Sequence, residues 1–98
     1  MMTEAFSKQI IERTAKQFQI GLDEILSSKR DKDIVVPRQV AMYLLRSELH
    51  LSFPKISHEL GRKDHTTAIH SVEKIEKELH FDSVLKEQVK EIKERLYA

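Results

Sequence analysis

The sequence predicts an all-α fold of about six helices, and three observations support this prediction. Glycine and proline, the residues that most often interrupt helices, occur only twice each in 98 residues. Strong helix formers are abundant between them. Apolar residues recur at intervals of three and four positions along most of the chain, which is the period of an amphipathic helix.

The chain has the size and composition of a single compact domain. It contains no Gly-, Ser- or Pro-rich linker and no abrupt change in composition at which to divide it. Hydrophobic residues make up 40% and charged residues 34%, which suits one modest core beneath a polar surface. We therefore expect residues 1–98 to form one ordered unit.

The first part of the chain predicts a helix, a short helix and a loop. The apolar positions of the first helix are Phe6, Ile10, Ile11 and Phe18. Gly21 then interrupts the pattern. The short helix that follows has its apolar side chains at Leu22, Ile25 and Leu26. The segment Ser27–Val36 is expected to be a loop.

Prolines indicate where the third and fourth helices begin. Pro37 suits a first helical turn, where its missing N–H is no loss, so a third helix is expected from there to about Leu49–Leu51. Its apolar stripe is Val40, Ala41, Leu44 and Leu45. Ser52 predicts a cap for a short fourth helix, with Pro54 in its first turn and Gly61 at its end. Its buried side is expected at Ile56 and Leu60.

Aspartates indicate where the last two helices begin. Asp64 is a candidate N-cap for the fifth helix, and Asp82 for the sixth. The apolar stripe of the fifth helix is Ala68, Val72, Ile75 and Leu79. The same spacing is repeated in Leu85, Val89, Ile92 and Leu96. Both helices are therefore expected to be amphipathic, and the remaining surface of the last one is almost entirely charged.

Several classes of protein are disfavoured by the sequence. The longest apolar run, Val40–Leu45, is far shorter than the roughly 20 residues of a membrane-spanning helix, and residues 1–5 lack the features of a secretion signal. Cysteine is absent, and the five histidines include no His-Glu-x-x-His spacing. We therefore expect no metal, no cofactor and no enzymatic activity, and a cytoplasmic location.

Positive charge is concentrated in the middle of the chain. The net charge is +1, but residues 29–63 carry 8 basic and 4 acidic side chains, a net charge of +4. The flanking residues 1–28 and 64–98 have net charges of −1 and −2. A basic patch of this kind attracts polyanions, although a solvated surface that binds nothing has the same composition.

Residues 52–79 have the spacing of a helix-turn-helix motif: a short helix, a turn of about three residues at Gly61–Lys63, and a longer helix. A helix in the major groove presents its N-terminal residues to base edges. At about 100° per residue, the face opposite the apolar stripe carries Thr66, Thr67, His70 and Lys74. This polar face is expected to contact double-stranded DNA.

Two interpretations stay open for side chains at the start of that helix. Asp64 can accept a hydrogen bond from a cytosine amino group, threonine methyls suit a thymine methyl, and Lys74 suits a phosphate. Asp64 and Thr67 can equally be an N-cap and its partner. His65 projects only about 50° from the centre of the apolar stripe, so it is as readily a partly buried side chain as a base reader.

Basic side chains outside the motif extend the predicted DNA surface. Lys29 and Arg30 lie in the expected loop, from which a basic side chain can enter a minor groove. The basic residues expected to neutralise phosphates are Arg38, Arg46, Lys55 and Lys63. Ordinary solvated charge is the alternative for each of them.

The segment Gly61–His70, GRKDHTTAIH, resembles the signature of the C-terminal DNA-binding domain of the bacterial replication initiator DnaA family. The similarity extends to Val36–Leu44 and Ser52–Ile56, and so to nearly the whole chain. It implies a six-helix, Trp-repressor-like fold that binds the DnaA box of replication origins and serves the initiation of replication. Double-stranded DNA, with no small-molecule substrate, is the implied partner.

The resemblance also implies roles for individual positions. Arg30 matches a minor-groove arginine, and Pro54 a residue that touches a thymine methyl. The implied major-groove base readers are Asp64, His65 and Thr66. Positions at which the family contacts phosphate and sugar hold Arg38, Arg46, Phe53, Thr67 and Lys74. The basic composition adds Lys29, Lys55 and Lys63 to the expected backbone contacts.

Some residues depart from the family pattern. Lys63 replaces a usual arginine, Ser57 a common glycine and Leu60 a common phenylalanine. Asp31 and Asp33 dilute the charge of the basic loop, which bears on affinity. The family's initiators also carry an ATPase domain, but two glycines forty residues apart cannot form a Walker phosphate loop. We therefore expect this chain not to hydrolyse ATP.

Two other functions are compatible with the same pattern. A helix-turn-helix transcriptional regulator would read a different operator through Asp64 and Thr66, and a palindromic site would favour it. A helical adaptor would use the exposed side of the last helix for protein contacts, with the basic patch serving solubility. One copy of one motif needs no palindrome, so a monomer on an asymmetric site is expected for the initiator-type domain.

Overall fold

The computed structural model describes residues 2–98, with side chains described for residues 5–98. Six helices and no strand are present in this range, which confirms the all-α prediction. The helices are α1 (Met2–Gln17), α2 (Leu22–Ile25), α3 (Lys32–Leu49), α4 (Phe53–Glu59), α5 (His65–Glu78) and α6 (Ser83–Leu96). No helix in residues 2–98 is long and apolar enough to cross a membrane.

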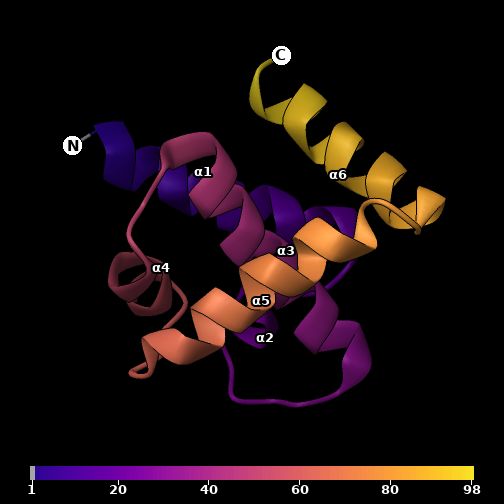
Figure 1. The fold of residues 1–98 in the computed structure, drawn as a ribbon. Coiled ribbons are helices and arrows are strands. Elements are labelled where there is room, and N and C mark those ends of the chain that lie inside the picture. The colour runs from indigo at the N-terminus through magenta and orange to yellow at the C-terminus, as the bar shows by residue number, and fades with distance from the viewer. Residues whose placement is uncertain (1) are drawn as a thin grey trace.

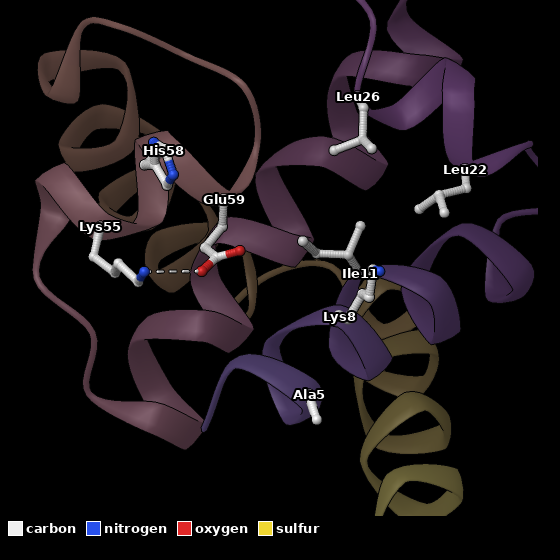
Figure 2. Close-up of a pocket in the computed structure, with 8 residues that line it drawn as sticks. All are labelled: Ala5, Lys8, Ile11, Leu22, Leu26, Lys55, His58 and Glu59. Carbon is white, nitrogen blue, oxygen red and sulfur yellow. Dashed lines mark ion pairs between the residues drawn. The ribbon is translucent and has the colours of Figure 1, made fainter. Parts of the chain in front are cut away.

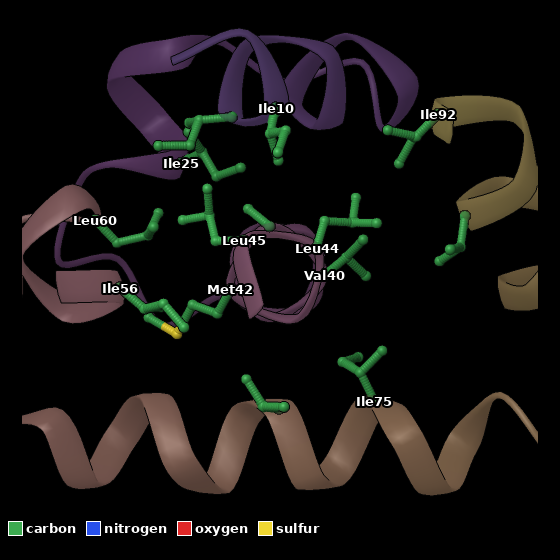
Figure 3. Close-up of a cluster of buried hydrophobic side chains, with 14 of the residues drawn as sticks. Ile10, Ile25, Val40, Met42, Leu44, Leu45, Ile56, Leu60, Ile75 and Ile92 are labelled. Carbon is green, nitrogen blue, oxygen red and sulfur yellow. The ribbon is translucent and has the colours of Figure 1, made fainter. Parts of the chain in front are cut away.

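The longest helix, α3, lies at the centre of the molecule (Figure 1). Figure 3 looks along it: α1 and α2 lie on one side, α5 on the other, and α4 and α6 flank it. Side chains from all six helices meet around α3 in one buried cluster. The fully buried contributions of α3 are Val40, Ala41, Met42, Leu44 and Leu45. The helices α1, α2, α4 and α5 therefore pack against α3, whereas α6 packs mainly on α1.

The predicted apolar stripes of the last three helices are buried. In α4 and its end, Ile56 and Leu60 are fully inaccessible to solvent. In α5, the inaccessible or nearly inaccessible residues are Ala68, Val72 and Ile75, and Leu79 is half-buried. In α6 they are Leu85, Val89 and Ile92, and Leu96 is half-buried. Burial of one stripe leaves the opposite faces of α5 and α6 to solvent, as the sequence pattern predicts.

The three predicted N-caps form. Ser52 Oγ accepts from Lys55 N at 3.3 Å, Asp64 Oδ1 from Thr66 N at 2.9 Å, and Asp82 Oδ1 from Leu85 N at 3.0 Å. Each bond satisfies one backbone N–H that the first turn of a helix leaves without a partner. The expected starts of α4, α5 and α6 are therefore confirmed.

The predicted start of the third helix is wrong. The helix begins at Lys32, so Pro37 is its sixth residue rather than part of its first turn, and the loop is Ser27–Asp31 instead of Ser27–Val36. Ile34 and Pro37 are buried on the side of the helix that continues the α3 stripe. Burial outweighs the weak helix propensity of this segment, and the proline removes only one bond, to the Asp33 carbonyl, near the helix start.

Candidate nucleic-acid interface

The turn of the helix-turn-helix is closed by hydrogen bonds to one buried serine. Arg62 N donates to the Ser57 carbonyl at 2.7 Å, and Ser57 Oγ donates to the Asp64 carbonyl at 3.3 Å. Ser57 is 1% exposed, so the serine end of both bonds is shielded from water. Gly61 takes a φ of 70°, which a residue without Cβ adopts at little cost. The turn therefore holds the start of α5 at a defined angle to α4.

The start of α5 is polar and open to solvent. Its exposed side chains are Asp64, His65, Thr66, Thr67 and His70, whereas Ala68 and Ser71 face the interior. His65 is therefore not the partly buried residue that its angle from the stripe allowed. An exposed row of donors and acceptors at a helix start suits contact with base edges in a major groove.

Asp64 combines two features that the sequence left as alternatives. Its Oδ1 caps α5, while the side chain as a whole stays exposed. The hydrogen bond from the Thr66 backbone, followed by one from the Thr66 side chain, lowers the pKa of the Asp64 carboxyl. The carboxylate is therefore ionised at neutral pH, and capping does not remove it from the surface.

The basic loop lies beside the start of α5. Lys29 and Arg30 are both exposed, and Lys29 Nζ lies 3.9 Å from Glu24 Oε2. A hollow of about 300 Å³ separates the loop from α5, and its polar lining includes Arg30, Arg62, Gln39 and Thr67. None of the residues that line this hollow is acidic. The structure thus brings Arg30 and Thr67 together, although they are far apart in sequence.

Arg38 is placed differently from the other predicted phosphate contacts. It is only 7% exposed, and its guanidinium donates to the carbonyls of Ile25 at 2.9 Å, Lys29 at 3.0 Å and Glu24 at 3.4 Å. Burial, and then repulsion from Arg62, lower the pKa of Arg38. The structure therefore shows Arg38 holding backbone from beneath the loop, and phosphate contact by this residue stays a prediction.

Arg46 and Phe53 form one unit where α3 meets α4. The Arg46 guanidinium lies 4.4 Å from the centre of the Phe53 ring, and its NH1 donates to the Leu51 carbonyl at 2.8 Å. Both side chains are half-buried, and Pro54 beside them is exposed. Arg46 and Phe53 are thus held in place by contacts within the protein, and DNA contact at these positions stays a prediction.

The predicted lysine contacts differ in their surroundings. Lys63 is exposed in the turn. Lys74 lies on the exposed side of α5, with Nζ 3.3 Å from Gln39 Oε1 and 3.9 Å from Glu78 Oε1. Lys55 Nζ lies 3.4 Å from Glu59 Oε1 and faces a hollow of about 630 Å³ formed by α1, α2 and α4 (Figure 2). No residue of α5 lines that hollow, so Lys55 is not gathered with the others.

Two residues important to the site received no role from the sequence. Arg62 donates from NH2 to the Ser27 carbonyl, across 35 positions of sequence. Ser57, which departs from the family's common glycine, closes the turn. The position of Arg62 inside the turn was a signal that it matters, but no local pattern identifies a partner so distant in the chain.

Among residues 5–98, no group of three or more histidine, aspartate or glutamate side chains could hold a metal ion. The arrangement of α4, a tight turn and α5 on the central α3 is that of a helix-turn-helix protein. The chain belongs to the family described as "Bacterial dnaA protein helix-turn-helix", which matches residues 7–75.

Similar proteins include chromosomal replication initiator proteins DnaA. The one from Thermoanaerobacter sp. (strain X514) is 48% identical over 89 residues, which cover 91% of this chain and 20% of the relative. The one from Geobacter sp. (strain M21) is 42% identical over 96 residues, covering 97% and 21%. The chain therefore spans about a fifth of the length of these relatives.

A solved structure described as a DNA replication initiation factor has the same fold. It matches 97% of this chain and 29% of its own chain, with a TM-score of 0.84 and 32% sequence identity. The predicted fold family is confirmed by this match together with the family assignment.

Proposed function

We propose that the chain binds double-stranded DNA sequence-specifically at DnaA-box-type sites of a replication origin and serves the initiation of chromosome replication. The observation that carries this proposal is the exposed polar start of α5, on a helix-turn-helix flanked by a basic loop. The relatives named as chromosomal replication initiators support it. Transcription regulation through the same sites is a further role of such binding.

In this proposal α5 lies in the major groove. Asp64, His65 and Thr66 contact base edges, and Asp64 does so as an ionised acceptor for a cytosine amino group. Pro54, exposed at the start of α4, touches a thymine methyl. These contacts determine which sequence is preferred.

The loop and the flanking side chains hold the DNA backbone and the adjacent minor groove. Arg30 enters the minor groove from the exposed loop. The proposed phosphate and sugar contacts are Lys29, Arg38, Arg46, Phe53, Lys55, Lys63, Thr67 and Lys74. Because the lysines and arginines among them neutralise phosphates, binding should weaken steeply as salt rises.

The chain would act as a monomer, in the cytoplasm on the nucleoid, and without enzymatic activity of its own. An initiator-type domain with one helix-turn-helix requires no second copy for recognition. ATP hydrolysis in the larger relatives would belong to sequence that this chain does not contain.

Selection from random duplexes tests the proposal. The 98-residue protein is incubated with a randomised library at low salt, and bound duplexes are sequenced over several rounds. A single asymmetric motif that resembles a DnaA box is expected. A palindromic motif would instead favour a transcriptional regulator reading another operator, and failure to retain any duplex at low salt would refute DNA binding.

Two variants separate base contacts from phosphate contacts on the selected site. Asp64→Ser keeps a capping oxygen but shortens the side chain, so it should reduce affinity about 10- to 100-fold and relax the preference at one position. Lys74→Ala should weaken binding to all sequences alike and flatten the salt slope by about 0.9. Glu87→Ala, an exposed substitution on α6, is the control and should change neither quantity.

A further inference from the structure

Two arginines from separate elements hold one short stretch of backbone. Arg38 of α3 donates to the carbonyls of Glu24, Ile25 and Lys29, and Arg62 of the helix-turn-helix donates to the carbonyl of Ser27. Four carbonyls between residues 24 and 29 are thus bonded to guanidinium groups. This stretch leads directly to Arg30, which is exposed.

The loop is also ordered from within. Ser27 Oγ donates to the Glu24 carbonyl at 2.6 Å and accepts from Lys29 N at 3.2 Å. With these bonds and those of the two arginines, the backbone before Arg30 has little freedom to move as an arm. A pre-organised segment loses less entropy when it binds than a flexible one does.

Arg62 connects this loop to the recognition motif. Arg62 stands two residues before Asp64, the cap of α5, and its backbone is fixed by the bond from Arg62 N to the Ser57 carbonyl. Its side chain reaches the Ser27 carbonyl, three residues before Arg30. One residue therefore spans the gap between the start of α5 and the basic loop, beside the hollow that Arg30 and Thr67 line.

We infer that Arg62, supported by Arg38, is a positioning residue that fixes the separation between the minor-groove side chain Arg30 and the major-groove helix α5. This inference rests on the proposed function. Its consequence is that the protein selects the spacing between the two parts of its site, as well as their sequences. Without this connection, the loop that carries Arg30 could shift to reach a minor-groove segment displaced along the DNA.

A direct phosphate contact by Arg62 is the competing explanation, since the side chain is half-buried and borders the hollow. The two roles differ in their dependence on Arg30. A positioning residue acts through Arg30, so its loss should matter little once Arg30 has been removed. Independent phosphate contacts contribute separately, and their losses add.

A double-mutant cycle on the selected site distinguishes them. Arg30→Ala and Arg62→Ala should each weaken binding about tenfold, and the double variant should be within about threefold of either single variant. Lys63→Ala is the matched control, because Lys63 is the exposed neighbour of Arg62 and touches no loop carbonyl. The losses of affinity from Lys63→Ala and Arg30→Ala should multiply in the double variant. Lys63→Ala should also reduce the salt slope of binding.

A spacing series supplies a readout that a merely structural role would not move. Sites are prepared with one base pair, a rise of about 3.4 Å, inserted or removed between the two contacted segments. The unsubstituted protein should lose about tenfold or more in affinity on the altered sites, and Arg62→Ala about threefold or less. Thermal unfolding of each variant shows that it is folded at the assay temperature, and Arg62→Lys, which keeps one donor, should recover part of the discrimination.

The outcomes separate the inference from the proposed function. If the selected site is bound but the losses from Arg30→Ala and Arg62→Ala multiply, or both proteins tolerate altered spacing equally, the positioning role is wrong and DNA binding stands. If the unsubstituted protein binds no duplex at low salt, the proposed function and this inference both fall.

Discussion

The guanidinium of Arg46 lies 4.4 Å from the centre of the Phe53 ring, so a side chain of α3 stacks on the first residue of α4. The same arginine donates from NH1 to the Leu51 carbonyl at 2.8 Å, within the connection between the two helices. A planar cation can stack on a ring and donate at its edge at the same time, which an ammonium cannot do. This contact therefore orients the first helix of the helix-turn-helix on the core.

Arg46→Lys should destabilise the fold by about 1 kcal/mol, because lysine keeps the charge but loses the stacking geometry and the bond to Leu51. Urea denaturation measures the change. Arg95→Lys, an exposed arginine of α6, is the matched control and should cost less than about 0.5 kcal/mol. Equal effects of the two substitutions would mean that the contact with Phe53 adds nothing to stability.

The cap of α5 should make stability depend on pH. Because the pKa of Asp64 is lowered in the folded protein, its contribution is present above the unfolded pKa of about 3.9 and is lost as the pH falls through the folded value. Asp64→Asn keeps a capping oxygen that does not titrate. The stability of the natural protein relative to Asp64→Asn should therefore decline on acidification, as followed by thermal unfolding. A difference that stays constant through this range would contradict the prediction.

A hydrogen bond between Tyr97 and Glu48 connects the ends of α3 and α6, and it should contribute to stability. Tyr97 Oη donates to Glu48 Oε1 at 2.7 Å, and Lys93 Nζ lies 3.5 Å from Glu48 Oε2. Tyr97→Phe removes the bond and keeps the ring against Phe6, so it should cost about 0.5 kcal/mol in urea denaturation at neutral pH. Phe81→Leu, a substitution at an exposed ring, should cost less.

The pKa shifts at this pair have opposite signs. Burial raises the pKa of Glu48, but bonds from Tyr97 and Ser47 and the charge of Lys93 outweigh it, so the pKa is lowered overall. The bond to Glu48 raises the pKa of Tyr97. The contribution of the pair should therefore hold between about pH 4.3 and pH 10, and disappear as the pH falls through the lowered Glu48 pKa or rises through the raised Tyr97 pKa. A Tyr97→Phe difference that does not change with pH would refute it.

Gly61 should be the costliest surface position of the turn to substitute. Its φ is 70°, while an added Cβ would meet nothing closer than the Leu26 carbonyl at 3.8 Å, so Gly61→Ala introduces backbone strain without a clash. A loss of about 1 kcal/mol is expected, and less for Gly61→Asn. A Gly61→Ala variant that unfolds at the same temperature as the natural protein would show that the turn can adopt another conformation.

The end of α3 offers the opposite case. His50 ends this helix with a φ of 55°, and His50→Gly should therefore be neutral or stabilising. Thermal unfolding provides the measurement.

Most helix boundaries could be predicted because they depend on neighbouring residues. Ser52, Asp64 and Asp82 cap helices through bonds to backbone only two or three residues away, and the apolar stripes repeat every three or four residues. The start of α3 was predicted wrongly for the opposite reason. Its first two turns are stabilised by burying Ile34 and Pro37 against the rest of the molecule, and local propensity does not report that burial.

The candidate site shows the same division. The polar start of α5 and the basic loop were evident in the sequence, as was the double nature of Asp64. The exposure of His65 could not be predicted, because an angle of about 50° from the apolar stripe is compatible with a partly buried or an exposed side chain. The burial of Arg38 was also missed, since an arginine in a basic segment has the same sequence signature whether it meets phosphate or backbone carbonyls.

By itself, the sequence determined the helical class, the caps and the polar face of the recognition helix, because these features arise from interactions within a few residues. Only the tertiary structure decided where α3 begins, that Arg38 lies beneath the loop, and that Arg62 reaches Ser27. These features depend on packing between segments far apart in the chain. Such contacts follow from the arrangement of the whole core around α3.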